Sequence, residues 1–264
     1  MHTFTAFVNR YSLIIFFVLA FALTWPLVPL ASVSLALPVL GLFGPALAAI
    51  VVTAITEGRP GVKTLLGRVV QWRAGWRWYA IALGLPIAAA LAVLEIHKLM
   101  GGVVPRGEGD PPALIATLAL LVVGEELGWR GFALPRLQAR LGGLGASLVL
   151  GGLWAAWHLA NSTIPGLERY LYDFPAFLLY VIAQTILFTW LANYTRGSVL
   201  LAWLFHAAIN TSGSLFAIGD PVRAWWLSAA VFGIVALMVL VVEGVGLGRH
   251  DSHLVNLPRA QAEI

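Results

Sequence analysis

The 264-residue chain contains no cysteine and little charge, and each shortage excludes a class of protein. Without cysteine there are no disulfides, no thiolate metal sites and no cysteine nucleophile. Only 11% of the residues are charged and 60% are hydrophobic, with a mean hydropathy of +0.88. Soluble domains carry about 25% charged residues. We therefore expect a polytopic membrane protein with an all-α helical bundle fold.

Three further absences narrow the function. The sequence has no glycine-rich phosphate loop, so nucleotide binding is not indicated. It also has no His-Glu-x-x-His element that would fix a metal site. The net charge of +4 is not a nucleic-acid signal, because the basic residues lie between apolar runs and form no patch.

Apolar runs of about 20 residues, the length that crosses a bilayer, recur eight times. The expected spans are Tyr11–Ser32, Leu37–Thr56, Trp76–Ile96, Ala113–Leu134, Gly142–Leu159, Pro175–Tyr194, Ser198–Ile218 and Ala224–Leu247. Pro135–Arg140 is predicted to be a short basic connector. We interpret residues 1–248 as one integral-membrane domain and residues 249–264 as a polar tail.

Residues 57–76, between the second and third spans, break the apolar pattern. Arg59, Lys63, Arg68 and Arg73 alternate there with apolar residues at roughly helical spacing. The pattern predicts an interfacial amphipathic helix, with its apolar face in the acyl region and its basic side chains toward the headgroups. A solvated loop is the alternative. With the N-terminus inside, twelve basic residues fall on one side of the bilayer and four on the other, so we expect both termini to be cytoplasmic.

Ionisable residues within the spans are costly and are therefore functional candidates. The fourth span contains Glu125, Glu126 and Arg130. Glu126 and Arg130 are an i, i+4 pair with the acid on the N-terminal side, the better orientation for an ion pair. Glu125 is rotated about 100° away from Glu126. We interpret Glu126–Arg130 as a structural brace and Glu125 as the available carboxylate; a single ionic cluster that only holds helices together is the alternative.

Three other polar residues lie deep in later spans: His158, His206 and Asn210. His206 and Asn210 are four residues apart, so they face one cavity. A lone membrane histidine often only bonds a backbone carbonyl, but two histidines, an asparagine and a glutamate on three spans indicate a site between facing helices.

Two chemistries fit these residues, and both lead to hydrolysis of an amide inside the membrane. A carboxylate and an imidazole in a dry pocket can deprotonate water, while a second histidine and an asparagine amide can stabilise the oxyanion that develops. Alternatively, Glu125, His158 and His206 can ligate a catalytic zinc that keeps one open position. The sequence does not separate the two routes.

The polar residues fall into three motifs, which are Glu125-Glu126-x-x-x-Arg130, Trp154-x-x-x-His158 and His206-x-x-x-Asn210. They resemble the motifs of the CAAX protease and bacteriocin-processing family, also called CPBP or Abi, over a core of residues 113–216. One departure is Trp154, because the family usually has phenylalanine there. We expect this difference to affect packing beside His158 more than chemistry.

The resemblance implies an intramembrane endopeptidase of about eight helices. In it, Glu125 and His158 would activate the water, His206 and Asn210 would stabilise the oxyanion, and the ion pair of the first motif would support the site. Both a metalloprotease and a metal-free glutamate mechanism have been proposed for the family. The need for zinc therefore stays open.

The implied substrate is a membrane-embedded or lipidated peptide or protein in the lipid bilayer, with neither nucleic acid nor nucleotide as a partner. Prokaryotic members have been tied to peptide maturation, immunity and membrane-anchored regulators, and this diversity leaves the substrate open. We expect a prokaryotic cell-membrane protein. The alternative is a catalytically silent binding or immunity protein of the same fold. Such a protein would be free to lose Glu125 or His206, and this chain has kept both.

The expected span boundaries contain one geometric conflict. Glu125 falls in the inner half of the fourth span, and His158 falls near the outer end of the fifth. For the two to meet, the fifth span must begin later or tilt, or the fourth must continue past Arg130.

Overall fold

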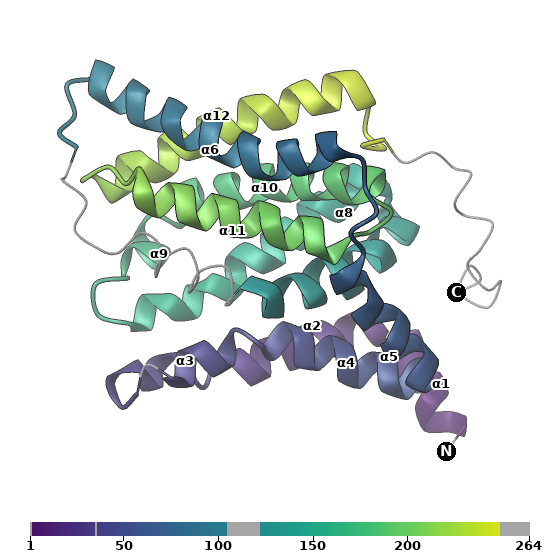
Figure 1. Cartoon of the computed structure of the whole chain (residues 1–264). Helices are drawn as coiled ribbons and strands as arrows, with labels where there is room; N and C mark the ends of the chain where they lie inside the picture. The colour runs from purple at the N-terminus through teal and green to yellow at the C-terminus, as the bar shows by residue number, and fades with distance from the viewer. Residues whose placement is uncertain (1, 35, 105–121, 249–264) are drawn as a thin grey trace.

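The computed structural model describes residues 2–34, 36–104 and 122–248 (Figure 1). All regular structure in these ranges is helical, which confirms the all-α bundle. The elements are α1 (His2–Arg10), α2 (Ser12–Thr24), η1 (Val28–Ser32), α3 (Ala36–Gly41), α4 (Gly44–Thr56), α5 (Gly58–Gly67), η2 (Arg68–Val70), α6 (Trp76–Leu99), η3 (Leu127–Ala133), α8 (Leu134–Trp157), η4 (His158–Thr163), α9 (Arg169–Tyr172), α10 (Phe174–Tyr194), α11 (Val199–Leu215) and α12 (Pro221–Glu243).

Six stretches of the described residues are long and apolar enough to cross a membrane, so this is an integral membrane protein. They are Ser12–Ser32, Ala36–Thr56, Trp76–Leu99, Val122–Thr163, Phe174–Tyr194 and Pro221–Glu243. α11 is apolar but shorter, at 17 residues. The expected total of eight stays a prediction, because most of the residues that open the fourth expected span lie outside the described ranges.

The helices enclose the segment that carries the acidic motif. α1 to α5 form one side of the bundle, α6, α11 and α12 form the other, and α8 and α10 lie between them (Figure 1). α2 packs on α4, α10 packs on both α8 and α12, and α11 packs on α6. The largest fully buried side chains include Trp129, Trp154 and Phe188. The centre of the core is therefore aromatic and lies beside the acidic motif.

The predicted connector Pro135–Arg140 is wrong, because α8 runs through it. Proline is tolerated in the first turn of a helix, where its missing N–H is not needed, so Pro135 does not end the segment. The chain reverses instead at Gly142, where φ is 69° and ψ is −175°. This left-handed backbone favours glycine, which has no Cβ to clash with the carbonyl.

The reversal at Gly142 brings the two catalytic candidates to one depth. Glu125 lies 17 residues before Gly142 and His158 lies 16 residues after it. At a rise of 1.5 Å per residue, both lie about 25 Å from the turn. The geometric conflict is resolved because the fourth span continues past Arg130, one of the alternatives considered above.

The helix expected between the second and third spans is present as α5 and η2. Its apolar face is only partly turned outward, because Leu65 is buried in the protein core while Leu66 is 45% exposed. Arg68 turns inward, and its Nη1 donates to the Gly131 carbonyl at 2.9 Å. Burial lowers the pKa of the Arg68 guanidinium, an effect that Glu57 opposes. The segment is thus attached to η3 and is not a solvated loop.

Two span ends also differ from the expectation. α6 continues to Leu99, so His97 lies inside its last turn and is only 2% exposed. α12 begins earlier than predicted, at Pro221, because the Asp220 carboxylate accepts a hydrogen bond from the Arg223 backbone N–H and caps the helix.

Candidate active site

The first motif lies where a helix widens. Residues 122–126 are α-helical and η3 continues them as π-helical turns, a distortion that is frequent at functional sites. Pro135 contributes to it, because proline cannot donate to the carbonyl four residues earlier, which is that of Gly131. The Arg68 side chain donates to that carbonyl. The segment that carries the motif is therefore stabilised by a hydrogen bond from Arg68 as well as by the hydrogen bonds of its own helix.

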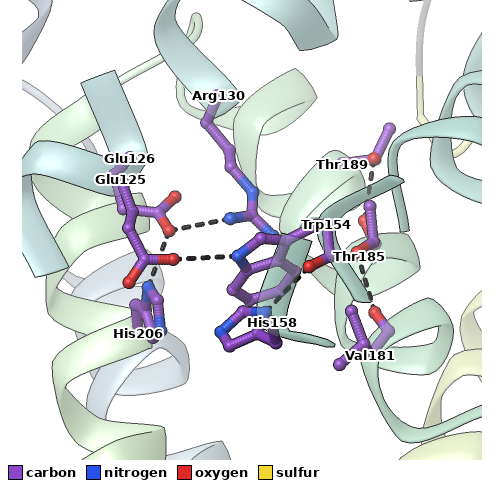
Figure 2. A network of polar contacts seen from close by, with 9 residues as sticks. All are labelled: Glu125, Glu126, Arg130, Trp154, His158, Val181, Thr185, Thr189 and His206. Carbon is purple, nitrogen blue, oxygen red and sulfur yellow. Dashed lines mark hydrogen bonds and ion pairs between the residues drawn. The ribbon is translucent and has the colours of Figure 1, made fainter. Parts of the chain in front are cut away.

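Glu126 is the centre of a buried ionic cluster. Its Oε1 accepts hydrogen bonds from Arg130 Nη1 and from His206 Nδ1, each at 2.7 Å (Figure 2). The exposed fraction is 0% for Glu126, 2% for Arg130 and 4% for His206. The expected Glu126–Arg130 ion pair is present, and its role as a structural brace stays a prediction. The bond to His206 was not expected and links the first motif to α11.

The Arg130 guanidinium is enclosed by aromatic rings. Its central carbon lies 3.7 Å from the centroid of Phe188 and 4.1 Å from that of Trp154. Cation–π contacts of this kind gain strength when they are desolvated. They offset part of the penalty of burying a charge, since Nε and Nη2 of Arg130 have no hydrogen-bond partner among the described residues.

Trp154 binds the catalytic candidate of the first motif. Its indole Nε1–H donates to Glu125 Oε2 at 2.8 Å, and Glu125 is 4% exposed (Figure 2). The indole thus adds a hydrogen bond to its packing contacts, one that phenylalanine could not make because it has no N–H to donate. Whether Trp154 affects packing more than chemistry stays a prediction. The signal in the sequence was the indole itself, which usually finds a hydrogen-bond partner when it is buried.

His158 is oriented by the same tryptophan. Its Nδ1 lies 2.8 Å from the Trp154 carbonyl, and because a carbonyl only accepts, Nδ1 carries the proton and Nε2 is left with a lone pair. The ring is held by Tyr170, stacked at 6.1 Å, and by the edges of Phe177 and Trp157 at 5.3 and 5.0 Å. It can therefore act as a base only through Nε2.

His206 and Asn210 lie on α11, opposite the first motif. His206 donates from Nδ1 to Glu126, so its Nε2 faces away from that bond. Asn210 is half-buried one turn further along the helix, and its side chain makes no hydrogen bond within the described part of the chain. Its amide is therefore free to bind a ligand.

All the expected residues except Asn210 thus converge in Figure 2, and they come from three segments, namely residues 122–133, the end of α8 with the start of η4, and α11. The donor types suit zinc, since both histidines have Nδ1 engaged and Nε2 free, as ligating histidines usually do. However, no three His, Cys, Asp or Glu groups among the described residues are close enough to hold one ion. The arrangement does not form a ready metal centre, so we derive no step through a metal.

A cavity of about 260 Å³, lined mostly but not wholly by apolar side chains, lies between α6, α10, α11 and α12. Ile209 and Ser212, the neighbours of Asn210 on α11, contribute to its wall. Trp225 connects the cavity to the histidine site: it lines the cavity and packs at 5.2 and 5.0 Å on Tyr170 and Phe177, which enclose His158. The cavity therefore adjoins the catalytic candidates without containing them.

Comparison with known proteins finds similar sequences over the part of the chain that carries the three motifs. Residues 108–212, which contain all three motifs, match the family model described as type II CAAX prenyl endopeptidase, Rce1-like. Over 132 residues the chain is 30% identical to the CAAX prenyl protease 2 of Methanococcus maripaludis. The match spans 48% of this chain and 48% of that relative, so it covers about half of each protein. The resemblance expected from the motifs is confirmed, because over its motif-bearing core this chain is similar to the Rce1-like CAAX prenyl endopeptidases.

Proposed function

We propose that this protein is an intramembrane endopeptidase that hydrolyses a peptide bond of a membrane-associated peptide or protein. The observation that carries the proposal is the double role of Trp154, whose indole N–H holds Glu125 and whose carbonyl holds His158. One residue thus orients a carboxylate and an imidazole, either of which can take a proton from water. The family comparison supports the same reaction class.

The water is activated by Glu125 and His158. Glu125 Oε1 has no hydrogen bond among the described residues, and His158 Nε2 has a lone pair, so both atoms can accept a proton. As the water oxygen bonds to the scissile carbonyl carbon, its proton passes to one of them. The same proton then moves to the leaving amine as the C–N bond breaks, which regenerates the free base.

His206 and Asn210 stabilise the oxyanion. Because His206 donates from Nδ1 to Glu126, it can donate from Nε2 only as an imidazolium. With His206 in that state, the formal charges of the four groups sum to zero: the two carboxylates are negative, and the Arg130 guanidinium and the His206 imidazolium are positive. A neutral cluster is the least costly arrangement in a buried site. The Asn210 amide supplies a second donor.

The substrate we propose carries an apolar group that holds it at the membrane. The relative is named a CAAX prenyl protease, and here a cavity with mostly apolar lining residues adjoins the site through Trp225. The test uses three peptides with purified, reconstituted protein: one ending in a prenylated CAAX sequence, the same peptide without the prenyl group, and an unmodified membrane-spanning peptide. Mass spectrometry identifies the products and the bond that is cut.

We expect cleavage of at least one apolar-anchored peptide, and complete loss of cleavage in Glu125→Ala while the protein still inserts and folds. Normal turnover in Glu125→Ala would refute its catalytic role. If folded wild-type protein cut none of the peptides, the catalytically silent binding protein would replace the enzyme as the best account.

The zinc requirement is tested by elemental analysis of the wild type beside the His158→Ala/His206→Ala double variant. Near-stoichiometric zinc that is absent from the variant would make the histidines ligands and would replace the mechanism above. Wild-type protein that cleaves peptide without bound metal would support Glu125 as the base.

A further inference from the structure

The segment between η2 and α6 presents large apolar and basic side chains outward. Val70, Trp72 and Trp76 are 71%, 64% and 82% exposed, values far from those of a protein core. Arg73 and Arg77 alternate with them and are exposed too. Tryptophan and arginine together are typical of the boundary between hydrocarbon and headgroups, where the apolar ring can contact acyl chains and the guanidinium can contact headgroups.

Hydrogen bonds fix this segment to the turn between α10 and α11. Gln71 Nε2 donates to the carbonyls of Thr195 and Arg196, both at 3.2 Å, and Ser198 Oγ donates to the Gln71 carbonyl at 2.6 Å. Arg196 Nη2 donates to the Arg73 carbonyl at 2.8 Å. The exposed side chains are therefore presented by a held backbone, and the two arginines from distant parts of the sequence lie together.

These two arginines share a shallow depression of about 490 Å³. Its lining consists of Val70, Gln71, Trp72, Arg73 and Arg196. The Arg73 guanidinium lies 5.6 Å from the Trp72 ring centroid, and among the described residues neither Arg73 nor Arg196 forms a salt bridge. The depression thus combines an apolar wall with two arginines that have no ionic partner.

Neighbouring elements do not neutralise this charge. The sequence has no acidic residue between Glu57 and Glu95 or between Asp173 and Asp220. Glu57 is paired with Arg136. Glu243, on α12, accepts hydrogen bonds from Tyr194 and Trp190. Within the part of the chain that the structure describes, the positive charge is therefore available to a ligand from outside the chain.

The depression lies where several membrane-crossing helices end. α6 begins directly after the segment, α10 ends and α11 begins at the bonded turn, and α12 ends at the same end of the bundle (Figure 1). Helix ends of this kind lie at the level of lipid headgroups. A ligand at this level that is both anionic and apolar is a phospholipid of the surrounding leaflet.

We propose that the depression is a binding site for the headgroup of an anionic phospholipid, with Arg73 and Arg196 on the phosphate and Trp72 and Trp76 against the upper acyl chain. The planar fork of arginine matches phosphate oxygens geometrically. This site is separate from the catalytic candidates, and the inference does not depend on the proposed function.

The test measures thermal unfolding of the full-length protein in mixed micelles as the mole fraction of phosphatidylglycerol is raised. Phosphatidylcholine with the same acyl chains and free inorganic phosphate are titrated in parallel. We expect phosphatidylglycerol to raise the unfolding midpoint more than phosphatidylcholine does, and free phosphate to have no effect. In Arg73→Gln/Arg196→Gln, the mole fraction of phosphatidylglycerol that gives half of the rise in unfolding midpoint should be about thirtyfold higher than in the wild type. This shift corresponds to about 1 kcal/mol for each arginine.

Arg73→Gln alone keeps every backbone hydrogen bond of the segment and should weaken the response about fivefold, so the test survives if the double variant does not fold. The matched control is Arg59→Gln/Lys63→Gln, which removes two exposed charges from α5 outside the depression and should respond like the wild type. An equal loss in this control would refute a specific site. Equal responses to the two lipids, or a response to free phosphate, would also overturn the proposal.

Discussion

The replacement Trp154→Phe tests the organisation of the site most directly. It keeps an aromatic ring beside Arg130 and His206 and keeps the carbonyl that accepts from His158, but it removes the N–H that holds Glu125. Phenylalanine is also the residue that the related family usually has at this place. A change toward the family pattern is therefore expected to harm this chain.

The size of the effect follows from the lost hydrogen bond. A bond to a charged group contributes about 1.5–3 kcal/mol. If Glu125 needs that bond to hold its orientation as it takes the proton, the loss is expressed in kcat, at about tenfold for each 1.4 kcal/mol. We expect kcat for a cleaved peptide to fall about 10- to 100-fold, with KM unchanged because Trp154 holds the base and does not bind the substrate.

The matched control is Trp157→Phe. Trp157 is also buried and packs on His158, but its Nε1 has no hydrogen-bond partner among the described residues. Both variants lose the same ring volume, but only Trp154→Phe also loses a hydrogen bond, so its unfolding midpoint should fall further than that of Trp157→Phe, which should keep kcat within about threefold. If the two variants had the same kcat, or if the loss in Trp154→Phe lay wholly in KM, the positioning role would be refuted.

Two substitutions test the packing of the first motif. Arg130→Ala leaves the Glu126 carboxylate buried without its guanidinium, which costs about 3–5 kcal/mol, so the unfolding midpoint in detergent should fall sharply; an unchanged midpoint would contradict the brace. Gly128→Ala would place a Cβ 2.6 Å from the Pro45 carbonyl group and should destabilise by about 1–3 kcal/mol. Gly152→Ala, whose Cβ meets no atom within 4 Å, should stay within about 0.5 kcal/mol of the wild type, and a similar loss in both glycine variants would argue against the close approach of α4.

Much of the fold could be predicted because each membrane-spanning helix corresponds to a continuous run of apolar residues in the sequence. A run of apolar residues must satisfy its backbone groups within itself, so its length and composition are enough to predict α10, which differs by one residue from the expected Pro175–Tyr194. The Glu126–Arg130 ion pair could also be predicted from the sequence, because residues four positions apart in a helix are neighbours.

Where the chain reverses could not be predicted from composition. A proline and three charged or polar residues made Pro135–Arg140 resemble a connector, but first-turn proline is compatible with a helix and the reversal needed the φ of Gly142. That shift of a few residues decides whether Glu125 and His158 lie at one depth or at opposite ends of their helices.

The sequence by itself determined the membrane class, the resemblance to a protease family and the identity of the polar residues that form the candidate site. Only the tertiary structure decided their partners: Trp154 on Glu125, and Glu126 on His206. The reason is physical. Each of these bonds joins residues 29 or 80 positions apart, and whether such groups meet depends on how whole helices pack, which no local pattern encodes.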